Sequence, residues 1–343
     1  MKKLFIAIVA LAAAAACSNV ETVSLNQEAI AFDNAFINNS VRSVETPGYS
    51  QANIFNDFAV YGFVEGASLF NGVKVAKSGV TNNELTSDWK YEGTQYWIAG
   101  ANYDFYAVAP FNGGWAVKEN TTPAATGATL TFTTTDGTQD LLYTNIVEKE
   151  GAVSGNTAVA FNFKHILSKV KFSFKNGYNA SAATIKVKDI KITNAYKTGE
   201  VALANAASWS NQDVEENFTL NFGMATDAEE TVDAQENVEV AYAYGKTYES
   251  QNERLLIPGN KEWNISFVVE LLVSGQKIAT YSHTAKATID FQPGNSYDIN
   301  AEITAANIDP NHAQEPIEFT ATMTDWSAAA DKNATVDTIK QNN

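Results

Sequence analysis

The stretch SKVKFSFKNG, residues 168–177, indicates the fold class of this chain. Val170, Phe172 and Phe174 alternate with lysine and serine residues, so the segment has one apolar face and one polar face. An apolar period of two is typical of a half-buried β-strand. The Asn-Gly pair that ends the stretch tolerates positive φ and predicts a β-hairpin turn.

The next apolar stretch, TIKVKDIKIT at residues 184–193, shows the same alternation with one interruption. Ile185 and Val187 share one face, and an extra polar residue shifts the phase before Ile190 and Ile192. A β-bulge at the interruption would return all four apolar side chains to one side of the sheet.

The strand pattern continues along most of the chain. Runs rich in Val, Ile, Thr, Tyr and Phe are separated by Gly, Asn, Asp or Pro, as is typical of strands and turns. No capped helical pattern of ten or more residues follows the N-terminal segment. The sequence therefore predicts an all-β fold built from β-sandwiches. The other predicted strands are 58–63, 103–109, 128–134, 158–163, 215–222, 238–244, 264–273 and 317–326.

The N-terminus has the features of a lipoprotein signal peptide. Two lysines precede an apolar run at 4–16, which is shorter than the roughly 20 residues that a membrane-spanning helix needs. Small residues lead directly into Cys17, the only cysteine of the chain. This resembles a lipobox and predicts lipidation of Cys17, with ordinary secretion as the alternative. A single cysteine cannot form an internal disulfide.

Length and charge limit the class of protein. About 325 residues remain after the signal peptide, which favours two domains. The net charge of −16 argues against binding to nucleic acid or to anionic lipid surfaces, because phosphate groups would be repelled. Residues 148–158 are polar and glycine-containing and are interpreted as a linker. The predicted organisation is signal peptide 1–17, leader 18–42, N-terminal sandwich 43–156, C-terminal sandwich 157–326 and tail 327–343.

Catalytic and metal-binding motifs are not apparent. His165, His283 and His312 lie far apart and lack a metal-ligand spacing, so no metal or cofactor is predicted and His165 is interpreted as structural. The segment DGTQD at 136–140 is predicted to be a turn rather than a cation site. There is no G-x-S-x-G motif. With 39 acidic residues a pair of glycosidase carboxylates stays open, but an enzyme is not expected.

Four aromatic residues gather around turn residues at 89–97 and allow two interpretations. Trp89, Tyr91, Tyr96 and Trp97 could form a platform on which sugar rings stack. They could equally be packing residues of a large sandwich, which is the favoured interpretation.

Five segments, in order along the chain, resemble the fimbrillin family. VAFNFKHILSKVKFSF resembles the middle signature of that family, with a histidine between an apolar strand and a Leu-Ser-Lys-Val strand. The others are similar to its Tyr-x-Pro turn strand, its segment before the midpoint, its Pro-Gly-x-x-Tyr strand and its closing strand with a terminal Trp. In the same order, they are YDFYAVAPFNG (103–113), DLLYTN (140–145), FQPGNSYDINAEIT (291–304) and IEFTATMTDW (317–326), and the signature is at 159–174.

This resemblance implies two tandem transthyretin-like Greek-key β-sandwich domains and an outer-membrane lipoprotein precursor. In the family, an arginine-specific protease cuts after an arginine near the mature N-terminus and removes the first strand. The matching position here is Arg42–Ser43, although family members often have alanine after the arginine. The leader would then contain the covering strand, whose apolar residues are Val23, Leu25, Ile30 and Phe32.

The function implied by the resemblance is a structural subunit of adhesive surface fimbriae. Its partners would be other fimbrial subunits through strand exchange, an arginine-specific protease, the outer membrane through the lipid anchor, and a host or bacterial surface ligand. The alternative is a surface glycan-binding lipoprotein that is not polymerised and uses Trp89 and Trp97 as its platform.

The segment that would be donated to a neighbouring subunit stays open. The tail carries Val336 and Ile339, which are three residues apart and therefore do not share a strand face. The segment 317–326 has a better strand pattern but can belong to the C-terminal domain itself.

Overall fold

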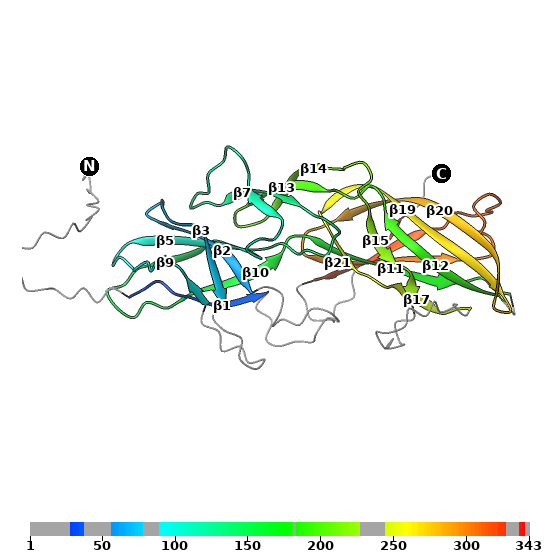
Figure 1. Cartoon of the computed structure of the whole chain (residues 1–343), viewed down its shortest axis with the longest axis horizontal. Helices are drawn as coiled ribbons and strands as arrows, with labels where there is room; N and C mark the ends of the chain where they lie inside the picture. The colour runs from blue at the N-terminus through cyan, green and yellow to red at the C-terminus, as the bar shows by residue number, and fades with distance from the viewer. Residues whose placement is uncertain are drawn as a thin grey trace, which may run out of the picture.

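The computed structural model describes residues 28–37, 56–77, 89–180, 183–226, 244–326 and 336–339. The described part is an elongated all-β molecule in which two groups of sheets follow one another along the long axis (Figure 1). The predicted all-β class is confirmed. Among the described residues there is no helix with the length and apolar character that a bilayer span requires.

The N-terminal half contains two sheets. The larger has the strand order β1-β10-β8-β5-β2-β3-β4, with β9 paired to β5, and the smaller has the order β14-β13-β7-β6. The strands of the larger sheet are β1 (Phe32–Ile37), β2 (Asp57–Val64), β3 (Ala67–Lys77), β4 (Trp89–Tyr91), β5 (Asn102–Ala109), β8 (Leu142–Thr144), β9 (Val147–Glu150) and β10 (Val159–His165). Those of the smaller sheet are β6 (Trp115–Val117), β7 (Ala128–Thr133), β13 (Thr198–Leu203) and β14 (Ser208–Asp213).

Strand β2 is apolar at nearly every position because both faces of its sheet are buried. Phe58 and Val60 belong to a core that also contains residues of β1, β3, β5 and β10. Tyr61 and Phe63 belong to a second core, shared with the smaller sheet. The sequence FAVYGFV of this strand therefore lacks the alternation of apolar and polar residues that is expected when one face is exposed to solvent.

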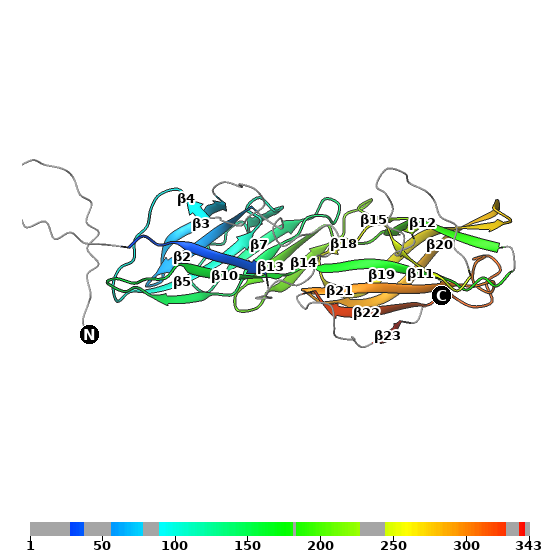
Figure 2. The same cartoon turned by 90° about the horizontal axis from the view of Figure 1, so that it is seen from below.

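The C-terminal half is a sandwich of two sheets around one core (Figure 2). One sheet has the order β16-β17-β11-β21-β22-β23, with β18 paired to β11, and the other has the order β15-β12-β19-β20. The strands of the first are β11 (Ser168–Asn176), β16 (Ala225–Thr226), β17 (Thr247–Ser250), β18 (Arg254–Leu256), β21 (Asn295–Ile303), β22 (Phe319–Asp325) and β23 (Val336–Ile339). Those of the second are β12 (Ala183–Ile192), β15 (Leu220–Gly223), β19 (Gly259–Val273) and β20 (Gln276–Phe291).

The predicted bulge in β12 is confirmed. The register between β12 and β19 shifts between Lys188 and Lys191, and Asp189 has a φ of +54°. The extra residue restores the phase, so every apolar side chain of the strand points into the C-terminal core. These fully buried side chains are Ile185, Val187, Ile190 and Ile192.

The hairpin predicted at the end of β11 is wrong, because β11 and β12 lie in different sheets. The N–H of Gly177 donates to the carbonyl of Ile303, and Tyr178 N–H donates to the side-chain oxygen of Asn176. Strand β11 pairs instead with β21 in parallel and with β17 and β18 in antiparallel. An Asn-Gly pair supports a change of direction, but it does not decide whether the next strand pairs or crosses to the facing sheet.

The interpretation of residues 148–158 as a linker is also wrong. The segment begins with β9, and Gly151 exchanges backbone hydrogen bonds with Gly100 and Ala101. Strand β10, which follows the predicted boundary at 156/157, lies in the N-terminal sheet, and β13 returns to pair with β7. Strand pairing therefore does not follow that boundary, and the division into two domains stays a prediction.

One other predicted strand differs from the structure, and another lies almost wholly outside the described residues. The segment predicted as 215–222 forms a strand only from Leu220, because Phe218 N–H closes a turn onto the carbonyl of Glu215. Of the segment 238–244, only Tyr244 is among the described residues, and it lies in a turn.

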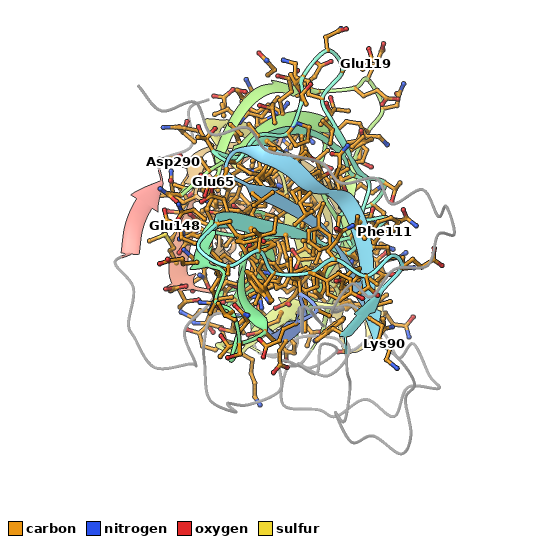
Figure 3. All side chains as sticks on the ribbon, turned by 90° about the vertical axis from the view of Figure 1, so that its left-hand side faces the viewer. Glu65, Lys90, Phe111, Glu119, Glu148 and Asp290 are labelled. Carbon is orange, nitrogen blue, oxygen red and sulfur yellow. The ribbon has the colours of Figure 1, made fainter. Side chains whose placement is uncertain are left out.

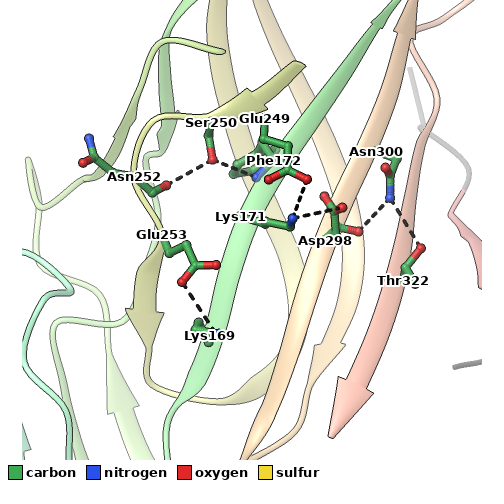
Figure 4. Close-up of polar contacts among 10 residues, drawn as sticks. All are labelled: Lys169, Lys171, Phe172, Glu249, Ser250, Asn252, Glu253, Asp298, Asn300 and Thr322. Atoms are coloured by element: carbon green, nitrogen blue, oxygen red, sulfur yellow. Dashed lines mark hydrogen bonds and ion pairs between the residues drawn. The ribbon is translucent and has the colours of Figure 1, made fainter. Parts of the chain in front are cut away.

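Polar side chains on the outer face of the C-terminal sheet tie the loop around β17 and β18 to β11 (Figure 4). The Lys171 ammonium lies 2.7 Å from a carboxylate oxygen of Glu249 and 3.7 Å from one of Asp298. Burial raises the pKa of the Asp298 carboxyl, while the nearby charge of Lys171 opposes this. Ser250 Oγ accepts from Phe172 N–H at 3.0 Å and continues the network along the strand.

Two glutamates, Glu65 and Glu148, lie at the end of the N-terminal half (Figure 3). The pKa of Asp104 is raised mainly by burial, and to a smaller extent by the negative charges of Glu148 and Glu65. The Glu65 carboxylate accepts from Asn102 N–H at 2.7 Å, which fixes the turn between β2 and β3 against β5. This end of the molecule therefore carries part of the negative charge seen in the sequence.

Candidate functional site

Residues 28–33 close the larger N-terminal sheet. Strand β1 runs parallel to β10, with Phe32 opposite Val159. On its other side, Ala29 forms a β-bridge with Tyr96, which lies just after β4 at the far end of the sheet order. One short segment thus joins the two ends of the sheet around the core.

Backbone hydrogen bonds hold this segment on both sides. Ile30 N–H donates to the Gln95 carbonyl at 2.8 Å, and Trp97 N–H donates to the Glu28 carbonyl at 3.0 Å. Toward β10, Val159 N–H donates to the carbonyl of Ala31 at 2.8 Å. The groups on both rims would lose these partners if the segment left.

Two buried side chains anchor the segment. Ile30 is 1% exposed and Phe32 is 4% exposed. The Phe32 ring lies between aromatic rings of four other strands, with centroid distances of 5.4 to 6.1 Å. Burial of the two side chains stabilises attachment of the segment by roughly 3–6 kcal/mol before entropy costs, at about 1.5–3 kcal/mol for each buried apolar side chain. The ring partners of Phe32 are Phe70, Tyr91, Phe105 and Phe161.

A loop between β9 and β10 binds the carboxylate of Glu28. Gly155 N–H donates to one oxygen at 2.8 Å, and Asn156 donates to the other from its N–H at 2.6 Å and its side-chain amide at 2.8 Å. Gly155 has a φ of +78°, which aims successive backbone N–H groups at one point, as in an anion-binding nest. Asn156 is itself held by Ala152, whose N–H donates to the Asn156 side-chain oxygen at 2.8 Å.

We expect attachment of the segment to weaken in acid. The hydrogen bond from Gly155 N–H, followed by the bonds from Asn156, lowers the pKa of Glu28. The contribution of this carboxylate is therefore present above the pKa of an unfolded glutamate and is lost as pH falls through the lowered folded value. As pH falls through this range, amide hydrogen exchange at Ile30 and Trp97 should accelerate more in the wild-type protein than in the Glu28→Gln variant. The variant has no carboxylate at position 28, so its attachment should not depend on this titration. Equal pH profiles for the two proteins would contradict this expectation.

The predicted site residues fall into two groups. Ile30 and Phe32 lie buried in the position just described. Their role as part of a removable covering strand stays a prediction. The others lie outside the described residues; they are Cys17, Val23, Leu25, Arg42 and Ser43.

The sugar platform, which was the alternative interpretation of Trp89 and Trp97, is not formed. Trp97 is 3% exposed and packs edge-on against Tyr103 at 4.8 Å. Trp89 packs against Phe58 at 4.8 Å. Both rings thus contribute to the core, in line with the favoured packing interpretation.

The structural interpretation of His165 is supported by its contacts. Its Nδ1 lies 2.7 Å from a carboxylate oxygen of Asp140, and its ring stacks on Trp326 at 3.6 Å. His283 stacks on Phe267, and burial lowers its pKa. Among the described residues, no group of three or more His, Cys, Asp and Glu side chains is arranged to hold a metal ion.

The predicted turn at 136–140 is confirmed. The Asp136 carboxylate accepts from Thr138 N–H at 3.0 Å and from the Thr138 hydroxyl at 2.7 Å. Gly137 supplies the positive φ of 74° that the turn requires.

The contact between Glu28 and Asn156 was not predicted from the sequence. They are separated by 128 residues, so no local spacing connects them. The only signal was indirect: Gly155-Asn156 can form a tight anion-binding turn, and the acidic residue Glu28 stands two positions before the apolar Ile30.

Comparison with known proteins gives a family match. A family model described as fimbrillin-like matches residues 50–326. No curated protein matches the chain. Among solved structures, a protein from Bacteroides uniformis assigned to cell adhesion is 15% identical, with a TM-score of 0.46, covering 87% of this chain and 98% of its own.

Two further solved structures are similar. The fimbrial anchor protein Mfa2 from Porphyromonas gingivalis is 12% identical, with a TM-score of 0.39, covering 87% of this chain and 97% of its own. A protein from Bacteroides thetaiotaomicron assigned to polysaccharide binding is 12% identical, with a TM-score of 0.38, covering 83% of this chain and 90% of its own.

Proposed function

Because this chain belongs to the fimbrillin-like family, we propose that it is a structural subunit of adhesive surface fimbriae that assembles by β-strand exchange. The family supports a cell-surface location and association with other fimbrial subunits. The observation that carries the proposal is the position of residues 28–33, which pair with β10 on one side and with Tyr96 on the other.

The proposed sequence of events begins with export. Cys17 is lipidated and holds the precursor on the outer membrane. An arginine-specific protease then cuts between Arg42 and Ser43 and frees the leader, which includes Val23 and Leu25 as well as the buried part of the covering strand.

Departure of the leader would create an acceptor groove. Its floor would be the aromatic rings around Phe32, and its rims would carry the unpaired N–H groups of Trp97 and Val159. An extended strand from another subunit can supply the missing backbone bonds and apolar side chains. Before the cut, the leader competes at the high effective concentration of a tethered segment, so exchange waits for proteolysis.

The structure restricts which segment can be donated. The segment 317–326 contains β22, which lies between β21 and β23, and Phe319 is buried in the C-terminal core. It therefore belongs to the domain itself. The tail contributes β23 at the edge of this sheet, where detachment would break pairing with only one neighbour.

The glycan-binding alternative loses its stated site, because Trp97 is buried. A host or bacterial surface ligand remains part of the proposal for the assembled fimbria. Catalysis has no role in the proposal.

The proposal predicts cleavage-dependent assembly. The chain lacking residues 1–17 is treated with an arginine-specific protease beside an Arg42→Ala variant, both carrying Arg254→Lys to remove the second arginine. We expect a new N-terminus at Ser43 and a ladder of oligomers on a non-boiled gel, and neither in the Arg42→Ala protein. Resistance of the folded protein at Arg42 would overturn the processing step. Cleavage that yields only monomer, even with fimbrial partner subunits added, would overturn assembly by exchange.

A further inference from the structure

Residues 28–32, which fill the groove, follow a simple sequence rule. Glu28, Ile30 and Phe32 alternate with two alanines. Each of the three side chains contacts a different part of the N-terminal half. Ile30 and Phe32 enter the aromatic core, while the Glu28 carboxylate lies on the Gly155-Asn156 loop. The described part of the groove thus recognises an acidic, an aliphatic and an aromatic residue at alternate positions of the strand.

We propose that the Gly155-Asn156 loop is a carboxylate-binding site that selects the strand occupying the groove and sets its register. The occupant after cleavage is an extended segment of a neighbouring subunit with the sequence acid-x-aliphatic-x-aromatic. This inference rests on the proposed function and adds to it the chemistry of the partner strand.

The geometry explains why a carboxylate is required. The three donors come from two backbone N–H groups and one amide, and they converge on two oxygens. A glutamine could accept with one oxygen only, and its own NH₂ would face a donor. A lysine would place a cation against three N–H groups. Bonds between N–H groups and an ionised acceptor are the strong ones, so the loop discriminates by charge as well as shape.

The carboxylate also defines register. A strand displaced by one residue would turn its apolar side chains away from the core. A strand displaced by two would place either its acid in the apolar Ile30 position or its aliphatic residue on the loop. In both cases the carboxylate loses its three donors, so the loop adds to the selection of register by the apolar core.

The tail of this chain matches the rule only in part. Asp337-Thr338-Ile339 has the acid and the aliphatic residue at the right spacing, but Gln341 stands where the leader has Phe32. A second segment, Glu315 to Phe319, matches fully, but its Ile317 and Phe319 are buried in the C-terminal core. We therefore expect the tail of a second copy to bind weakly and a subunit with a complete motif to bind well.

The test measures competition for the groove in protein cut after Arg42. A labelled leader peptide, residues 23–37, is displaced by unlabelled peptides of wild-type sequence or carrying Glu28→Gln. We expect the glutamine peptide to bind roughly threefold to tenfold more weakly, because solvent screens part of this charge-assisted contact. A tail peptide, residues 333–343, should gain affinity with Gln341→Phe and lose that gain when Asp337→Asn is added.

The protein side of the contact supplies the matched control. Asn156→Asp places a like charge against the peptide carboxylate and should reverse the preference, so that the glutamine peptide binds better than the glutamate peptide. Asn120→Asp adds the same charge at an exposed turn and should leave the preference unchanged.

The outcomes separate this inference from the function on which it rests. Equal binding of the glutamate and glutamine peptides would overturn the carboxylate site and leave strand exchange intact. If no peptide enters the cut protein, the proposed function fails. The carboxylate site is then tested in the uncut chain, where the leader still occupies the groove. There, Asn156→Asp should accelerate amide exchange at Trp97 and Val159 about tenfold more than Asn120→Asp does. Equal rates would overturn the carboxylate site.

Discussion

Replacing Phe32 with alanine is expected to lower the free energy of unfolding of the N-terminal half by about 3–5 kcal/mol, the usual cost of truncating a buried phenylalanine. The side chain sits among four aromatic rings contributed by β3, β4, β5 and β10, which cannot all move to fill the space. Urea denaturation followed by tryptophan fluorescence would measure the change.

The neighbouring residue gives the control for this variant. Ala31 is exposed, and only its backbone takes part in the pairing with β10, so Ala31→Ser should change the free energy of unfolding by less than about 0.5 kcal/mol. In protein cut after Arg42, Phe32→Ala should also release the leader faster than Ala31→Ser. A loss below about 1 kcal/mol for Phe32→Ala would mean that the groove collapses without its occupant, and the acceptor model would fail.

The second large effect is expected for Trp97→Ala, with a loss of about 3–5 kcal/mol in the free energy of unfolding. Trp97 is almost fully buried and contacts Tyr103 and Phe105, which form the floor of the same core. Its truncation should destabilise the N-terminal half and leave any glycan affinity of the folded protein unchanged. Thermal unfolding and a glycan-array measurement on the same samples would test both parts.

Tyr96→Ala is the matched control, since Tyr96 is adjacent and 47% exposed. Its backbone bridge to Ala29 does not depend on the side chain, so we expect a loss below about 1 kcal/mol. The opposite result, in which Trp97→Ala keeps its stability but loses glycan binding, would restore the platform interpretation.

Strand identity was largely predictable in this chain, because the alternation of apolar and polar side chains is a local property. The bulge at Lys188-Asp189 is a clear case: four isoleucine and valine residues must share one face, and only an extra residue allows it. The buried pair Ile30 and Phe32 was likewise visible as an apolar burst within a polar leader.

Strand partners were not predictable in the same way. The Asn-Gly pair after β11 predicted a hairpin, yet β12 lies in the facing sheet and β11 pairs with β21, more than one hundred residues later. The linker-like segment before β10 proved to be the loop that binds Glu28. Both errors came from turn residues, whose backbone preferences are local, while the strands that they connect pair through long-range packing.

Local sequence patterns were sufficient to predict the all-β class, most strands, the apolar faces and the resemblance to the fimbrillin family. Tertiary structure alone decided that residues 28–33 close a sheet, that Trp97 is buried, and that Glu28 meets Asn156. The physical reason is that side-chain periodicity specifies which face of a strand must be buried. Which other strand buries it depends on contacts between residues far apart in the chain, and these have no local signature.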